Sequence, residues 1–118
     1  MTTDELAALL EGDGVQLVDV RSAEEYEGTA GYGCDPVQGH IPGAVNIEWS
    51  ELLAAGAGIP GLLAERGVES DARIVCYCHS GSRSGMAAAI LRTAGYDASN
   101  YVGSWHEWSA RPDLPVES

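Results

Sequence analysis

Two kinds of hydrophobic pattern alternate along the chain. Short apolar runs, which are typical of buried strands, occupy residues 15–20, 40–47, 73–78 and 98–103. Segments with helix signals, such as a capping residue, helical spacing of leucines or a closing glycine, occupy residues 2–12, 22–26, 50–58, 60–67, 84–95 and 104–112. This alternation predicts an α/β domain with a mainly parallel central sheet and helices on both faces.

Two of the predicted strands carry chemistry where they end. The run "RIVCYC" is continuously apolar, as in a strand buried on both faces, and it ends in Cys78. Asp19 lies at the end of the first strand, and both strand ends should meet at the carboxyl edge of a parallel sheet, where such folds keep their sites. Residues 28–39 hold four glycines and a proline, which predicts a long loop.

Length and charge narrow the class of protein. The 118 residues suit a single domain, 1–118, and no apolar run approaches the ~20 residues that span a bilayer. The first residues lack the basic-then-apolar pattern of a signal peptide, so we expect a cytoplasmic protein. The net charge is −12 and the six basic residues are scattered arginines, which argues against nucleic-acid and membrane partners.

The segment from Cys78 to Arg83 joins a predicted strand to a predicted helix. At such a junction the free N–H groups of the helix start point into the loop, and Gly81 allows the backbone to curl around them. These dipoles and the Arg83 guanidinium favour the thiolate form of Cys78. The pattern therefore predicts a nucleophilic cysteine at the bottom of an anion-sized bowl.

Four motifs, "DVRSAEEY", "GHIPGAVNI", "CHSGSRS" and "GSWHEW", follow one another in the spacing of a known family. The chain resembles the rhodanese-like domain family over nearly its whole length. It is most similar to the catalytic half of the two-domain thiosulfate and mercaptopyruvate sulfurtransferases, here as a single domain.

The resemblance implies sulfur transfer without a metal or an organic cofactor. Cys78 would take the outer sulfur of a donor such as thiosulfate as a persulfide, and cyanide, a thiol, a thioredoxin-like protein or a sulfur-carrier protein would accept it. Arg83 would hold the sulfonate of the donor. The loop that stabilises the persulfide would comprise His79, Ser80, Gly81, Ser82, Arg83 and Ser84.

Two other functions share this pattern. Related phosphatases and arsenate reductases have a loop one residue longer, whereas Arg83 follows Cys78 by five positions, so the tighter bowl suits one sulfur atom better than a phosphate. A non-catalytic module that binds an anion or a partner's persulfide is the other alternative. Thiosulfate users often carry a basic residue where this chain has His79, and Arg83 favours thiosulfate over mercaptopyruvate as donor.

Three cysteines without a secretion signal argue against a disulfide framework. Cys76 is expected to pack in the core. Cys34, in the glycine-rich loop, is either an incidental thiol or one that resolves the persulfide of Cys78 as a disulfide. The letters "CYCH" lack the second ligand pair of a structural zinc site, so no metal is expected there.

Four further residues are expected to support the site. Asp19 and Arg21 should form a structural charged pair at the sheet edge, and His40 should be a structural hydrogen-bonding residue near the loop. Trp105 has two interpretations, as a wall of the substrate pocket or as a cover for the core. Ser104 is predicted to cap the last helix.

Overall fold

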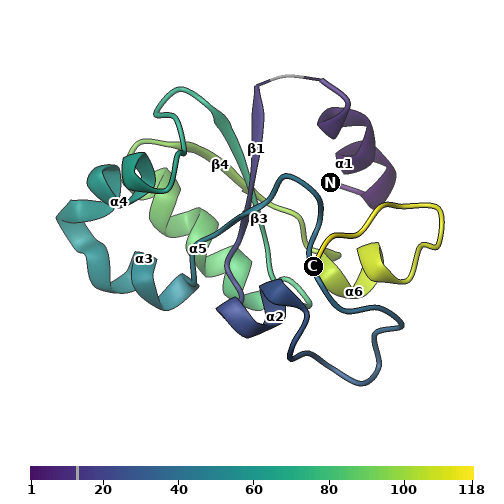
Figure 1. Ribbon diagram of the computed structural model, residues 1–118. Coiled ribbons are helices and arrows are strands. Elements are labelled where there is room, and N and C mark those ends of the chain that lie inside the picture. Colours follow the sequence, from purple (N-terminus) through teal and green to yellow (C-terminus); the bar gives the residue numbers. More distant parts are fainter. Residues whose placement is uncertain (13) are drawn as a thin grey trace.

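A four-stranded, fully parallel sheet forms the centre of the protein (Figure 1). The computed structural model describes residues 1–12 and 14–118. In the order β2-β1-β3-β4, the strands are Val45–Asn46, Val15–Asp19, Arg73–Tyr77 and Asp97–Asn100. In the central pair Asp19 lies opposite Tyr77, so both of these strands end at one edge and the residue after Tyr77 is Cys78.

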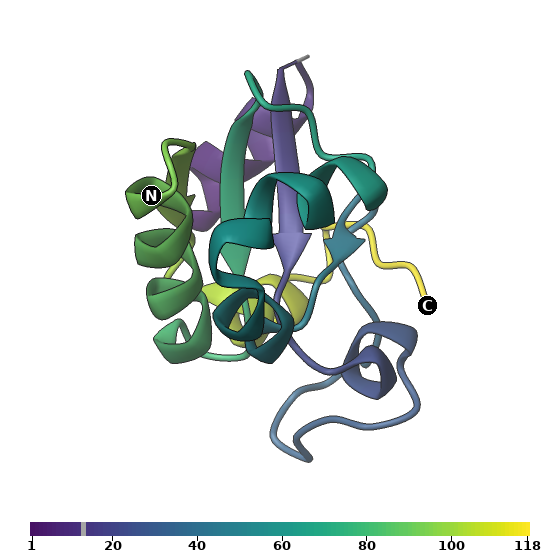
Figure 2. The ribbon, with the colours of Figure 1, turned by 90° about the vertical axis from the view of Figure 1, so that its left-hand side faces the viewer.

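Helices cover both faces of the sheet, as the sequence predicts (Figure 2). The helices are α1 (Thr3–Leu10), α2 (Ala23–Glu27), α3 (Trp49–Ala55), α4 (Ile59–Glu65), α5 (Ser82–Thr93) and α6 (Ser104–Ser109), with a short 3-10 helix, η1 (Gly56–Gly58), before α4. Helices α3, α4 and α5 pack on one face, and α1 and α6 on the other. The predicted α/β class is confirmed.

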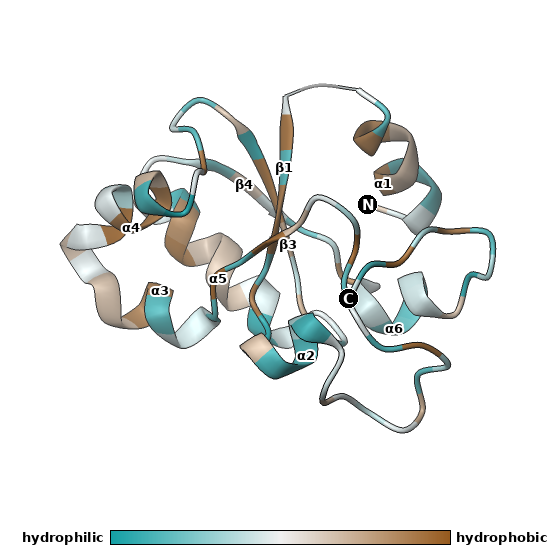
Figure 3. Ribbon diagram, in the orientation of Figure 1, coloured by the Kyte–Doolittle hydropathy of each residue, from teal (hydrophilic) through white to brown (hydrophobic). Residues whose placement is uncertain are grey.

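The alternation of side chains along the strands divides the core into two clusters. In β3, Ile74 and Cys76 face α3–α5, whereas Val75 and Tyr77 face α1 and α6. Hydrophobic residues accordingly follow β3 and α5 in Figure 3. Cys76 is fully buried in the first cluster, as expected, and Cys78 continues the same face.

Several predicted boundaries were wrong by a few residues. The strand predicted for 98–103 is Asp97–Asn100, because the chain turns after Asn100 toward α6. Ser104 does not cap α6: it has a left-handed φ of 55°, Gly103 takes the capping position, and the Ser104 hydroxyl binds another segment. This left-handed conformation, which is uncommon outside glycine, gave no sequence signal.

Segments outside the sheet fix the long loop of residues 28–39. His40 pairs with Glu117 in an isolated antiparallel bridge, so the C-terminal segment lies beside the end of this loop. The loop extends from α2 below the carboxyl edge of the sheet (Figure 1). Within the described residues, every helix is too short or too polar to cross a bilayer.

Candidate active site

The loop between β3 and α5 is shaped by Gly81. Its φ of +100° lies in the left-handed region, and a Cβ atom there would come within 2.8 Å of the carbonyl oxygen of Val102. Helix α5 begins at the next residue, Ser82, so its free N–H groups face the loop. The backbone therefore curls toward Cys78 only because position 81 has no side chain.

Hydrogen-bond donors surround the sulfur of Cys78. The backbone N–H of Gly81 lies 3.1 Å from Sγ, and the hydroxyl of Ser84 lies 3.3 Å from it. The Ser104 hydroxyl lies farther away, at 4.0 Å, and its proton goes to the carbonyl of Tyr101. Burial raises the pKa of the Cys78 thiol, but hydrogen bonds from Ser84, Gly81 and Ser80 outweigh burial, and the pKa lies below that of an ordinary thiol. The site thus favours a charged sulfur.

Asn100, at the end of β4, connects both sides of the loop. Its amide nitrogen donates to the carbonyl of Gly81 at 3.0 Å, so its oxygen must face Ser84, whose hydroxyl donates to it at 2.6 Å. A hydroxyl has one proton, so Ser84 bonds either to Asn100 or, after rotation, to the sulfur of Cys78. The hydroxyl therefore accepts from the neutral thiol or donates to the thiolate.

The start of α6 clamps the other side of the loop. The Ser104 hydroxyl accepts from the backbone N–H of Cys78 at 3.0 Å and donates to the carbonyl of Tyr101 at 2.8 Å. The backbone N–H groups of Trp105 and His106 donate to the carbonyls of Cys78 and His79 at 2.9 and 3.0 Å. The left-handed backbone of Ser104 thus serves to hold Cys78 in place.

Arg83 is held by Glu25 of α2. The guanidinium Nη1 and Nη2 donate to the two carboxylate oxygens at 2.9 and 3.2 Å. Burial raises the pKa of Glu25, but the hydrogen bonds from Arg83 and Ser22 outweigh it and lower the pKa to about 2. Two of the five N–H donors of Arg83 point at Glu25, and three remain for another anion.

The sulfur of Cys78 is more covered than an open bowl implies. Its residue is 1% exposed. The long loop folds back beside it, because the Tyr32 ring stacks on the His79 ring with 3.8 Å between centroids. In this conformation the hydrogen-bond donors around the sulfur are in place, Cys78 itself is buried, and Tyr32 of the long loop lies against the neighbouring residue, His79.

The predicted pair of Asp19 and Arg21 is present and buried. Arg21 Nε and Nη2 bind both carboxylate oxygens of Asp19 at 2.6 to 3.1 Å, and Nη2 also donates to the carbonyl of Gly39 at 2.6 Å. The guanidinium lies 5.0 Å from the centre of the Trp105 ring. The pair therefore fixes the end of the loop of residues 28–39. Within the part of the chain that the structure describes, neither side chain forms a hydrogen bond with Cys78.

His40 and Trp105 have structural positions. His40 stacks on Tyr26 at 3.7 Å and donates from Nδ1 to its carbonyl at 2.7 Å. Trp105 is fully buried in the cluster beneath α1 and α6, and its indole N–H donates to the carbonyl of Val37 at 3.0 Å. Of its two interpretations, the structure favours the core.

The remaining loop residues contribute differently. His79 turns toward the long loop and lies 2.9 Å from Asp35, while Ser82 begins α5. All three cysteines are free thiols: Cys34 is exposed, and the other two are buried.

Sequence reasoning missed Glu25, Asn100, Ser104, Tyr32 and Asp35 as neighbours of the loop. Besides holding Arg83, Glu25 forms the capping box of α2 with Ser22. The others come close through tertiary contacts across many residues, for which local patterns contain no signal.

Comparisons with known proteins agree with this geometry. The family model described as "Rhodanese-like domain" matches residues 2–111. The chain is 39% identical to a thiosulfate sulfurtransferase of Azotobacter vinelandii, covering 97% of this chain and 44% of that protein. It is 36% identical to a 3-mercaptopyruvate sulfurtransferase of Escherichia coli, covering 98% of this chain and 43% of that one.

Solved structures agree as well. The crystal structure of a probable thiosulfate sulfurtransferase is 39% identical to this chain, with a TM-score of 0.80; the match covers all of this chain and 47% of that protein. A structure of the protein EanB in complex with ergothioneine matches with 27% identity and a TM-score of 0.84, over 31% of its length. The chain spans less than half the length of these relatives. From motifs, fold and relatives together, the chain belongs to the rhodanese-like domain family.

Proposed function

We propose that this domain is a sulfurtransferase that carries sulfur on Cys78, taking it from thiosulfate or a similar donor. The observation that carries the proposal is the N–H of Gly81 at 3.1 Å from the sulfur, beside the Ser84 hydroxyl at 3.3 Å. Donors aimed at one sulfur atom stabilise negative charge on it, and such charge is present in both the thiolate and the persulfide. The names of the relatives support the same chemistry.

The first half-reaction loads the cysteine. The Cys78 thiolate attacks the outer sulfur of thiosulfate, an S–S bond forms, and the bond to the sulfonate sulfur breaks. Sulfite leaves with that electron pair, and Cys78 becomes a persulfide with an anionic terminal sulfur. The loop N–H groups and hydroxyls supply the hydrogen bonds for this anion.

The second half-reaction regenerates the free thiolate of Cys78. A thiolate or cyanide attacks the terminal sulfur, the S–S bond of the persulfide breaks, and Cys78 leaves as a thiolate with the electron pair. The products are a persulfide of the acceptor or thiocyanate. Hydrogen bonds lower the pKa of Cys78, so its thiolate leaves more readily than that of an ordinary cysteine.

Arg83 is the proposed anchor for the sulfonate. Glu25 fixes its guanidinium with two hydrogen bonds, so the fork is oriented before a donor arrives. Three N–H groups remain to bind sulfonate oxygens by charge-assisted hydrogen bonds. Glu25 also neutralises part of the positive charge of Arg83, which weakens the hold on the sulfite product and favours its release.

The donor must reach a sulfur that is 1% exposed. We propose that the loop of residues 28–39 opens for entry, because it holds His79 through the stacked Tyr32. Opening separates Tyr32 from His79, and Asp35 from His79 and His106, but leaves the Gly81 and Ser104 hydrogen bonds, which come from other segments. The activated sulfur therefore persists while its cover moves.

The groups that we propose for this chemistry lie close together in the chain's fold. Cys78, Ser84, Arg83, Glu25 and Ser104 all come from elements around a single sheet. This arrangement supports the proposal that residues 1–118 act as one domain that loads sulfur by itself.

Intact-mass spectrometry tests the proposal. The protein is reduced, incubated with thiosulfate, desalted and weighed, beside a Cys78→Ser variant and a Cys34→Ser control. We expect the wild type and Cys34→Ser to gain the mass of one sulfur atom and Cys78→Ser to gain none. An equal gain in Cys78→Ser, or no gain in the wild type, would overturn it.

A further inference from the structure

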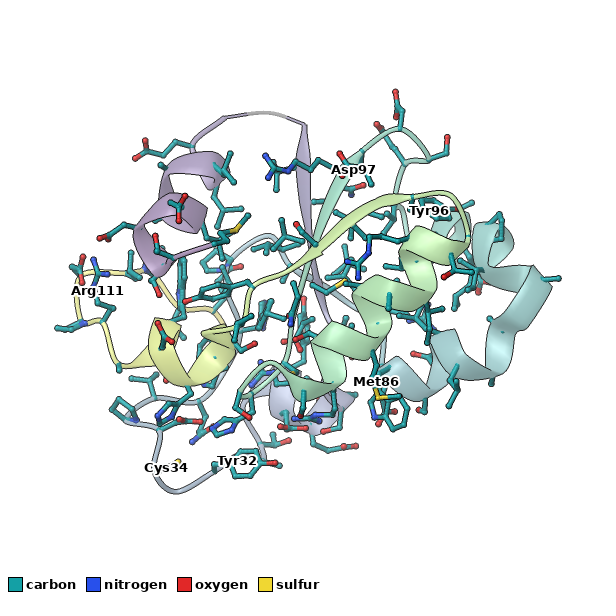
Figure 4. The ribbon with its side chains drawn as sticks, turned by 180° about the vertical axis from the view of Figure 1, so that it is seen from behind. Tyr32, Cys34, Met86, Tyr96, Asp97 and Arg111 are labelled. Carbon is teal, nitrogen blue, oxygen red and sulfur yellow. The ribbon has the colours of Figure 1, made fainter. Side chains whose placement is uncertain are left out.

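Four side chains outside the sulfur network meet at the inner side of the long loop. They are Cys34, Asp35, His79 and His106, and one potential ligand atom of each lies within 4.8 Å of the others. Two come from the loop below the sheet edge, where Figure 4 labels Cys34, one follows the catalytic cysteine and one lies in α6. Among the described residues, none of these four side chains hydrogen-bonds to the sulfur of Cys78.

Asp35 is the centre of the cluster and is incompletely bonded. Its side chain is 1% exposed, and its Oδ1 accepts from His106 Nδ1 at 2.9 Å. Its Oδ2 lies 2.9 Å from His79 Nε2, but the two groups are not aligned for a hydrogen bond. Neither atom therefore has a hydrogen-bond partner among the described residues. A buried carboxylate oxygen without a partner is costly, so the pair of atoms is poised for a ligand that binds both.

We propose that Cys34, Asp35, His79 and His106 bind a divalent transition metal of the zinc class. Thiolate, imidazole and carboxylate are the ligands that zinc prefers, and four of them complete its tetrahedron. In such a tetrahedron the ligand atoms lie about 3.5 Å apart, so the cluster needs only small side-chain movements to close around an ion.

The charges of the site balance. A thiolate and a carboxylate cancel the two positive charges of the metal, and the net charge of −12 on the protein attracts a cation over long range. Binding releases the thiol proton of Cys34 to solvent. His106 gives up the proton on Nδ1 and takes one from water on Nε2, which is easy because its side chain is 53% exposed.

The ligands are already held by their surroundings. The Tyr32 ring stacks on His79, and the backbone N–H of His106 donates to the His79 carbonyl at 3.0 Å. The backbone N–H of Asp35 donates to the carbonyl of Tyr32 at 3.1 Å. Contacts of this kind orient the ligands of metal sites.

Cobalt(II) provides the test, because a cobalt–thiolate bond gives a charge-transfer absorption band. The titration uses the Cys78→Ser variant, so that the neighbouring nucleophile cannot bind the metal. We expect one cobalt per chain with this band, and displacement by zinc. Adding Cys34→Ser should remove the band, and adding His106→Gln should weaken binding about tenfold or more. Asp97→Asn, an exposed residue at the start of β4 and outside the cluster, is the control and should change neither.

A second measurement does not depend on variants of the ligands. In the Cys78→Ser protein, the exposed Cys34 should react readily with iodoacetamide, and one equivalent of zinc should protect it. Absence of stoichiometric cobalt binding, a band that persists without Cys34, or alkylation of Cys34 unchanged by zinc would each overturn the proposal. Circular dichroism establishes that each variant is folded.

Discussion

Glu25 in α2 holds Arg83 in α5 across 58 positions of the chain, with both carboxylate oxygens on the two terminal nitrogens of the guanidinium. The distances are 2.9 and 3.2 Å, and the Arg83 side chain is 26% exposed. A bidentate pair of this kind fixes the plane of the guanidinium. An acid outside the loop therefore aims the arginine that we propose as the anchor for the donor.

Replacing Arg83 should weaken the binding of thiosulfate. In Arg83→Ala we expect KM for thiosulfate to rise about tenfold or more, since a charge-assisted contact of about 1.5–3 kcal/mol is lost. Arg83→Lys should restore only part of the lost affinity for thiosulfate, because an ammonium cannot form the two parallel hydrogen bonds of a guanidinium. Steady-state kinetics with cyanide as acceptor measures both. An unchanged KM in Arg83→Ala would remove Arg83 from donor binding.

The pair also predicts a loss of stability in acid. The pKa of Glu25 is lowered to about 2 from 4.5, so its contribution to the free energy of unfolding is complete above pH 4.5 and is lost as the pH falls through 2. Urea unfolding between pH 5 and pH 2 measures it. Glu25→Gln should be less stable at pH 5 and should lose less stability over this range. Parallel curves for both proteins would contradict the prediction.

Gly81 should tolerate no side chain. In Gly81→Ala the new Cβ would meet the Val102 carbonyl at 2.8 Å in a left-handed conformation, so we expect a stability loss of about 1–3 kcal/mol and loss of sulfur loading. Gly61→Ala in α4 is the matched control: its Cβ meets nothing within 4 Å, and it should stabilise the protein by about 0.5–1 kcal/mol. Thermal unfolding measures the change in stability, and intact-mass spectrometry after thiosulfate treatment measures sulfur loading. Normal loading in Gly81→Ala would show that the curled loop is dispensable.

The two buried cysteines should differ in reactivity. Burial raises the pKa of Cys76 to about 12, whereas hydrogen bonds lower that of Cys78. In the native protein we expect iodoacetamide to modify Cys34 first, Cys78 more slowly as its cover opens, and Cys76 only after unfolding. Peptide mapping after timed alkylation measures the order. Modification of Cys76 before Cys78 would contradict the assignment of the activated thiol.

The net charge predicts a salt effect on the first half-reaction. The protein carries −12 and thiosulfate is a dianion, so long-range repulsion slows their encounter. Moderate ionic strength screens this repulsion, and kcat/KM for thiosulfate should rise. Stopped-flow loading at several salt concentrations measures it. A steep fall would instead indicate a local positive field at the entrance.

The parts of the site that are local in the chain are the parts that could be predicted. The apolar run ending in Cys78, the glycine at 81 and the helix after it lie within one stretch, so pattern and turn chemistry sufficed. Arg83 and the loop length followed from the same stretch. The pair of Asp19 and Arg21 is two positions apart, and its hydrogen bonds are again local.

The other parts depend on tertiary contacts that no local pattern records. Asn100 and Ser104 reach the loop because β4 pairs with β3 and the chain then turns back. Ser104 resembled a helix cap because serine commonly is one, but its left-handed backbone sends the hydroxyl to Cys78. The stacking of Tyr32 on His79 depends on how the loop of residues 28–39 folds, and glycine-rich composition does not specify that fold.

A single turnover from isolated, loaded protein tests sulfur transfer most directly. Protein treated with thiosulfate labelled in its outer sulfur is freed of donor and mixed with cyanide, and labelled thiocyanate is counted. We predict close to one labelled thiocyanate per chain, with none from Cys78→Ser. Thiocyanate that forms only while free thiosulfate is present, or equally in Cys78→Ser, would contradict a covalent sulfur carrier at position 78.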